Sequence, residues 1–157
     1  MRIRTLALLL PMFLLSACAS PKATFQVAIR NDTKDPLSVG LIKIGGEVEA
    51  GWDGPEHIAM HAPVLADRKW GTLVKPGEVV TLGPQTGTFV EGTHAILRVY
   101  AANATVDELL GFSRTDSGRL DIMLWPGPSA YTIDRRDGGL HYEHVTPEPP
   151  AAAATRE

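Results

Sequence analysis

The sequence predicts an all-β protein: a single antiparallel β-sandwich, immunoglobulin-like or transthyretin-like, with at most one short helix. Short segments rich in Val, Ile, Leu and Phe alternate apolar and polar residues, as strands with one buried face do. Clusters of Gly, Pro, Asn and Asp separate these segments at intervals of roughly 8 to 15 residues, which predicts about eight or nine short strands. No repeat of fixed period is visible, which argues against a propeller or a solenoid and leaves an open barrel as the second architecture.

The first strands are predicted between residues 24 and 50. Residues 24–31 (TFQVAIRN) have the strict period of two that a half-buried strand requires. In residues 37–44 the apolar positions change parity beside Gly40, which indicates either a bulge or a strand buried on both faces. Gly45-Gly46 then predicts a tight hairpin turn into residues 47–50.

The middle of the chain is less regular. Residues 51–70 show no sustained period and are expected to form a long loop, with one helical turn at Glu56–Met60. Residues 71–83 (GTLVKPGEVVTLG) contain two short apolar runs around the turn sequence KPGE, which predicts a second hairpin. Residues 84–93 are expected to form a further loop.

Strands are again predicted toward the C-terminal end of the domain. Residues 94–102, 119–125 and 129–145 predict a strand, a second strand and a hairpin with its turn at Asp137-Gly138-Gly139. Between them, Thr105 followed by Glu108 is compatible with a capping box that begins a short helix. A strand over residues 108–113 is the competing interpretation.

The first seventeen residues are typical of a secretory signal peptide. Arg2 and Arg4 precede an apolar run of ten residues, Leu6 to Leu15, and the small residues Ser16 and Ala17 follow it. A membrane-spanning helix needs ~20 apolar residues to cross ~30 Å of hydrocarbon, so this run is too short to remain as a transmembrane anchor.

The end of that run, Leu15-Ser16-Ala17-Cys18, resembles the lipobox of bacterial lipoprotein precursors. The resemblance implies cleavage between Ala17 and Cys18 and a diacylglyceryl group, with palmitate-like acyl chains, on the new N-terminal Cys18. It implies a lipid anchor in the cell envelope and no other cofactor. A disulfide is excluded because Cys18 is the only cysteine. Ala19 stands where the inner-membrane retention signal of such lipoproteins has Asp, which favours the outer membrane, facing the periplasm.

Four segments follow from this interpretation. Residues 1–17 are the signal peptide that is removed, and residues 18–23 are the lipidated N-terminus and a short linker. Residues 24–145 are the β-sandwich domain, and residues 146–157 are a Pro- and Ala-rich tail that is expected to be disordered. The linker spans only about 15–20 Å when fully extended, so the domain is expected close to the bilayer.

Net charge limits the class of partner. Residues 1–17 contain two arginines and no acidic residue, so their removal changes the formal net charge from −3 to −5. An acidic chain without a basic cluster is not expected to bind nucleic acid, because phosphate neutralisation requires grouped Lys and Arg side chains.

Two sets of side chains are candidates for a binding site. His57 and His61 are four residues apart, so on a helix they would share one face and could share a metal ion; the alternative is a pair of surface-loop histidines. Trp52, Trp70 and Trp125 lie at loop borders, where exposed rings could stack on the sugars of peptidoglycan. Alternatively, the three rings plug the ends of the sandwich, with each N–H bonded to a carbonyl.

No motif for catalysis is present. The chain lacks GxSxG, the HExxH zinc motif and the glycine-rich phosphate loops, and no thiol remains once Cys18 is acylated. The sequence therefore predicts a membrane-anchored, non-catalytic β-sandwich that binds or scaffolds another envelope protein. A peptidoglycan-binding module and a metal-binding protein are the alternatives. The arrangement is similar in architecture to the β-sandwich lipoprotein of type VI secretion, although no motif in the domain carries that analogy.

Overall fold

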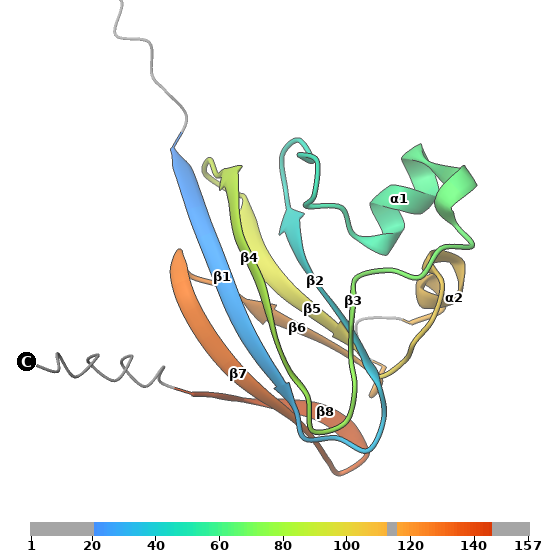
Figure 1. Ribbon diagram of the computed structural model, residues 1–157. Helices are drawn as coiled ribbons and strands as arrows, with labels where there is room; N and C mark the ends of the chain where they lie inside the picture. Colours follow the sequence, from blue (N-terminus) through green and yellow to red (C-terminus); the bar gives the residue numbers. More distant parts are fainter. Residues whose placement is uncertain (1–20, 113–115, 146–157) are drawn as a thin grey trace, which may run out of the picture.

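Two four-stranded sheets pack face to face in the computed structural model, which describes residues 21–112 and 116–145 (Figure 1). The strand order is β4-β1-β7-β8 in one sheet and β3-β2-β5-β6 in the other. The strands are β1 (Lys22–Asn31), β2 (Leu37–Ile44), β3 (Thr72–Val74), β4 (Val79–Thr88), β5 (His94–Tyr100), β6 (Arg119–Met123), β7 (Gly127–Arg136) and β8 (Gly139–His144). The predicted β-sandwich is confirmed. The predictions for the signal peptide, Cys18 and the C-terminal tail lie outside the described residues.

Two features go beyond the predicted fold. The structure has two short α-helices, α1 (Pro55–His61) and α2 (Val106–Leu110), where at most one was expected, and a 3-10 turn, η1 (Pro63–Leu65). The neighbours β1 and β7 run parallel, whereas the other paired strands are antiparallel. Parallel neighbours require a long crossover, and here the chain passes through both sheets between β1 and β7.

The main core lies between the inner faces of the two sheets. Its central side chains are fully buried, among them Val27 and Ile29 of β1 and Leu97 and Val99 of β5. A second cluster lies on the outer face of the β3-β2-β5-β6 sheet, where α1, α2 and the chain around Trp70 cover it. Its buried members are Ile42, Trp70, Ile96, Tyr100, Ala104, Val106 and Leu109.

The second cluster explains the parity change in β2. Leu41 belongs to the core between the sheets and Ile42 to the outer cluster, so the strand is buried on both faces, as one of the two interpretations expected. Gly40 is needed for close approach, because a Cβ atom there would lie 2.7 Å from the Trp70 ring.

The hairpin predicted over residues 71–83 is wrong. β3 pairs with β2 in one sheet, whereas β4 pairs with β1 in the other. The intervening turn therefore crosses the end of the sandwich, where the buried Asn31 amide donates to the Val74 carbonyl (2.9 Å). The Gly77 N–H in turn donates to the Asn31 carbonyl (2.7 Å).

Two other local predictions are also wrong. Residues 47–50 form no strand, because the neighbours of β2 are already β3 and β5. Residues 84–88 continue β4 instead of beginning a loop. β4 tolerates Pro84 because it is an edge strand, and the pairing register with β1 shifts beside this position.

The helical predictions agree with the structure. The expected turn at Glu56–Met60 is part of α1. The capping box is present at α2, with Glu108 N–H donating to Thr105 Oγ1 (3.3 Å) and Thr105 N–H donating to Glu108 Oε2 (2.7 Å). Neither helix in the described part of the chain is long and apolar enough to cross a membrane.

Candidate functional site

The layer that covers the outer faces of β2 and β5 begins with the residues that lead into α1. Trp52 and Asp53 lead into Gly54, the N-cap, and Pro55 occupies the first turn, where its missing N–H costs nothing. The Trp70 indole N–H donates to the Asp53 carbonyl (3.0 Å), which ties both ends of this long connection together. The sequence 51–70, without a period, thus forms a fixed layer.

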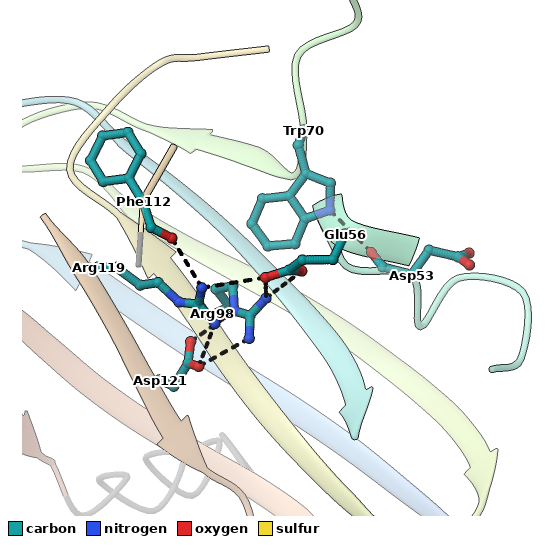
Figure 2. A network of polar contacts seen from close by, with 7 residues as sticks. All are labelled: Asp53, Glu56, Trp70, Arg98, Phe112, Arg119 and Asp121. Atoms are coloured by element: carbon teal, nitrogen blue, oxygen red, sulfur yellow. Dashed lines mark hydrogen bonds and ion pairs between the residues drawn. The ribbon is translucent and has the colours of Figure 1, made fainter. Parts of the chain in front are cut away.

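A buried arginine holds α1 on the sheet. Arg98 lies in the middle of β5, is 3% exposed, and points outward beneath α1 (Figure 2). Its Nε and Nη2 donate to the two oxygens of Asp121 on β6 at 2.8 and 3.0 Å. Its Nη1 donates to both oxygens of Glu56 on α1 at 2.8 and 2.7 Å. One guanidinium therefore joins the helix to two strands.

Arg119 completes this ion-pair network from β6. Its Nη2 donates to Asp121 (3.0 Å), and its Nη1 donates to Glu56 (3.3 Å) and to the Phe112 carbonyl (3.2 Å) (Figure 2). Two arginines and two carboxylates balance in formal charge. Because the carboxylates are already shared between the guanidiniums, we interpret the network as a clamp on α1 rather than as a proton-transfer site.

The electrostatics keep the clamp ionised. Burial raises the pKa of Asp121, but hydrogen bonds from Arg98 and Arg119 and their positive charges outweigh it and hold the pKa below its ordinary value of 3.8. Burial lowers the pKa of Arg98, yet Asp121 and Glu56 raise it above its ordinary value. Burial also raises the pKa of the neighbouring Tyr100 phenol. Both Arg98 and Asp121 are therefore charged at neutral pH.

The two candidate histidines lie side by side on α1. The ring centroids of His57 and His61 are 4.4 Å apart, and His57 Nδ1 lies 2.7 Å from Asp53 Oδ1. The expected shared helix face is therefore present. Within residues 21–112 and 116–145, no three His, Cys, Asp or Glu side chains are grouped so that they could hold a metal ion.

The three tryptophans differ in exposure. Trp52 is 1% exposed and Trp70 is 6% exposed, and their indole N–H groups donate to the carbonyls of Thr86 (3.4 Å) and Asp53 (3.0 Å). Both rings are packed in the buried clusters and present no face to a sugar. Trp125 is 80% exposed, in the connection between β6 and β7.

Two strongly exposed apolar side chains lie at the end of α1 and in η1. Met60 is 75% exposed and Val64 is 87% exposed, and we call residues 60–64 the α1–η1 tip. Backbone hydrogen bonds fix it, from Ala62 N–H to Ile58 O (2.7 Å) and from Leu65 N–H to Ala62 O (2.9 Å). Local spacing did not reveal this tip, because Met60 belongs to α1 and Val64 to η1, on either side of the break at Ala62.

Sequence reasoning did not identify the residues of the clamp. Arg98 is separated from Asp121 by 23 residues and from Glu56 by 42, so no local spacing connects them. The one available signal was an arginine inside the otherwise apolar strand sequence HAILRVY. Ala17 and Cys18, the predicted cleavage and lipidation residues, lie outside the described part of the chain.

Comparison with known proteins gives one similar structure. The chain matches no protein-family model and no curated protein sequence. Among solved structures, the T6SS lipoprotein TssJ1 from Pseudomonas aeruginosa is similar with a TM-score of 0.40 and 15% sequence identity. The alignment covers 82% of this chain and 100% of that chain. No residue role is transferred between two chains this different.

Proposed function

We propose that this chain is a lipid-anchored envelope lipoprotein whose non-catalytic β-sandwich binds another envelope protein. The lipobox-like residues that end in Cys18 support the anchor, and Ala19 in place of Asp favours the outer membrane, facing the periplasm. The single observation that carries the binding role is the α1–η1 tip, where Met60 and Val64 stand in solvent on a rigidly held support.

The tip has the properties of a preorganised binding element. Removing apolar surface from water stabilises by about 25 cal/mol per Å², so Met60 and Val64, two largely exposed side chains four residues apart, offer a useful gain to a partner. The Arg98–Glu56 ion pair and the Trp70–Asp53 hydrogen bond fix α1 before any partner arrives. Little conformational entropy is then lost on association, which favours affinity.

The residues around the tip define the partner's chemistry. Asp67, Arg68 and Lys69 follow η1 and are all exposed, so charged side chains of both signs adjoin the tip along the chain. Protein interfaces combine an apolar centre with a polar rim in this way. The complementary surface is therefore a protein groove that accepts a thioether and a branched aliphatic side chain.

Site-specific crosslinking tests this proposal. A photo-crosslinking residue replaces Val64 in the full-length chain in its native envelope, and a matched one replaces Glu143, an exposed residue of β8. We expect one discrete protein adduct from position 64 and none from position 143. The adduct should disappear when Met60→Ser is added. Equal labelling from both positions, or no adduct from position 64, contradicts the binding role.

Lipidation has a separate test. Cys18→Ser should accumulate as an unprocessed precursor and take up no radioactive palmitate, because the acylated thiol is gone. Labelling equal to that of the unchanged protein would refute the anchor, independently of the crosslinking result.

A further inference from the structure

The end of the sandwich at which β1 begins gathers several connections. The Phe89 N–H donates to the Pro21 carbonyl (3.0 Å), and Lys22 pairs with Thr88, so the β4–β5 connection adjoins the start of the described chain. Ile44 at the end of β2 pairs with His94 at the start of β5. The β2–α1 and β4–β5 connections therefore lie at the same end as the N-terminus of β1 (Figure 1). We call this end the N-terminal end.

A hollow of about 510 Å³ opens at the N-terminal end, between these two connections. Val48 and Val90 line it and are partly exposed. Lys43 and Glu49 also line the hollow, and they pair with each other (2.9 Å), while Glu49 also accepts from the Thr88 N–H (2.9 Å). The charges of Lys43 and Glu49 are thus satisfied internally, whereas Glu47, which also lines the hollow, is exposed to solvent.

Trp125 adds an aromatic ring near the same end. The preceding residue, Leu124, donates its N–H to the Ala95 carbonyl at the start of β5 (3.0 Å), and Gly127 pairs with Phe25 of β1. The Trp125 indole is 80% exposed, so it does not pack in the core. Tryptophan side chains are enriched at membrane–water interfaces, where the ring meets lipid and the N–H meets water.

We infer that the N-terminal end is a second membrane contact, in which Val48, Val90 and Trp125 rest on the bilayer surface that holds acylated Cys18. The inference depends on the proposed lipid anchor. Only Ala19 and Ser20 separate the acylated Cys18 from Pro21, and the three Cα-to-Cα steps span about 10 Å when extended, so the N-terminal end lies within reach of lipid headgroups. Such a short tether makes the contact intramolecular, so a weak interaction suffices.

The chemistry of this end favours an uncharged contact with lipid. The exposed Glu47 and Glu91 outnumber the exposed Lys22 there, so anionic headgroups gain no net electrostatic attraction. The aliphatic and aromatic side chains supply the contact, and it orients the domain. With the N-terminal end against the bilayer, the domain lies in one defined orientation instead of rotating freely on its acyl chains.

Fluorescence quenching by lipid tests the contact. The full-length acylated protein is reconstituted into phosphatidylcholine vesicles whose acyl chains carry bromine near the headgroup. Emission assigned to Trp125, by subtraction of the Trp125→Phe spectrum, should fall by about twofold or more relative to unbrominated vesicles. Trp52 and Trp70, buried in the protein, serve as internal references.

Matched variants locate the contact. Val48→Ser with Val90→Ser should reduce the quenching of Trp125. Val79→Ser should leave it unchanged, because Val79 is an exposed residue at the start of β4 that pairs with Arg30, at the opposite end of the sandwich. Protein that is acylated and floats with the vesicles but has an unquenched Trp125 overturns this inference and leaves the anchor intact. Protein that is neither acylated nor vesicle-bound overturns the anchor itself. Equal losses of quenching in both sets of variants also contradict the assignment to this end.

Discussion

Arg98 and Asp121 lie opposite each other in the β5–β6 pair and form two parallel hydrogen bonds, at 2.8 and 3.0 Å. The remaining nitrogen of the same guanidinium, Nη1, donates a hydrogen bond to Glu56 on α1. A bidentate arginine at the centre of a strand thus holds α1 against the outer face of the sheet. The presentation of the α1–η1 tip depends on this contact.

Arg98→Met should destabilise the protein by up to about 3–5 kcal/mol, because it leaves Asp121, beneath α1, and Glu56, on α1, with Arg119 as their remaining partner in the clamp. The midpoint of urea unfolding, followed by circular dichroism, measures this loss. Arg98→Lys should recover only part of it, since an ammonium cannot form the two parallel bonds to Asp121.

Arg135→Ala is the matched control for this prediction. Arg135 is an exposed arginine that pairs with Asp35 at 3.6 Å, and exposed pairs contribute about 0–1 kcal/mol. A loss at Arg135 equal to the loss at Arg98 would show that burial of the clamp is unimportant.

Acid should weaken the clamp. The folded-state pKa of Asp121 lies below its ordinary value of 3.8, so its contribution to stability is present above that pH and is lost as pH falls through the folded-state pKa. Asp121→Asn should lower stability at neutral pH and flatten the decline below about pH 4. Unfolding free energies measured between neutral and acidic pH give both slopes. Glu143→Gln, which removes an exposed carboxyl on β8, should leave the slope unchanged.

Local pattern predicted strands well where one face is buried, and poorly where partners are distant in the sequence. Residues 24–31 and 119–123 alternate because one side faces the core. The turn KPGE is equally suited to a hairpin and to a crossing between sheets, so residues 71–83 were assigned to one hairpin. Only the pairing of Val74 and Val79 with different partners, Leu37 and Arg30, decides between these.

The candidate site was predicted less completely than the fold. The shared face of His57 and His61 follows from a helical spacing of four. The clamp and the α1–η1 tip do not follow from spacing, because Glu56, Arg98 and Asp121 meet only after β5 and β6 have paired and α1 has packed on the outer face of their sheet. Burial of Trp52 likewise depends on Phe89, more than thirty residues away, whose ring packs edge-on against it at 5.3 Å.

Gly40→Ala should disturb the outer cluster. A Cβ atom at Gly40 would lie 2.7 Å from the Trp70 ring, closer than packed atoms approach, so the indole must shift. Overpacking of this kind costs about 1–3 kcal/mol, and near-ultraviolet circular dichroism should change with it. Gly111→Ala is the control, because the nearest atom to its added Cβ lies at 3.4 Å, and a neutral or slightly positive effect is expected.

Tryptophan accessibility distinguishes a sugar-stacking surface from plugged ends. In the unchanged protein without lipid, acrylamide should quench mainly Trp125, because Trp52 and Trp70 are buried. Trp125→Phe should therefore remove most of the quenchable emission while leaving the blue-shifted emission of the other two rings. Peptidoglycan fragments should not alter that remaining spectrum, since neither buried ring presents a face to a ligand. Strong acrylamide quenching of Trp125→Phe, or a spectral shift with the fragments, would show that Trp52 or Trp70 is accessible. Either result would support a carbohydrate-binding surface formed by these rings.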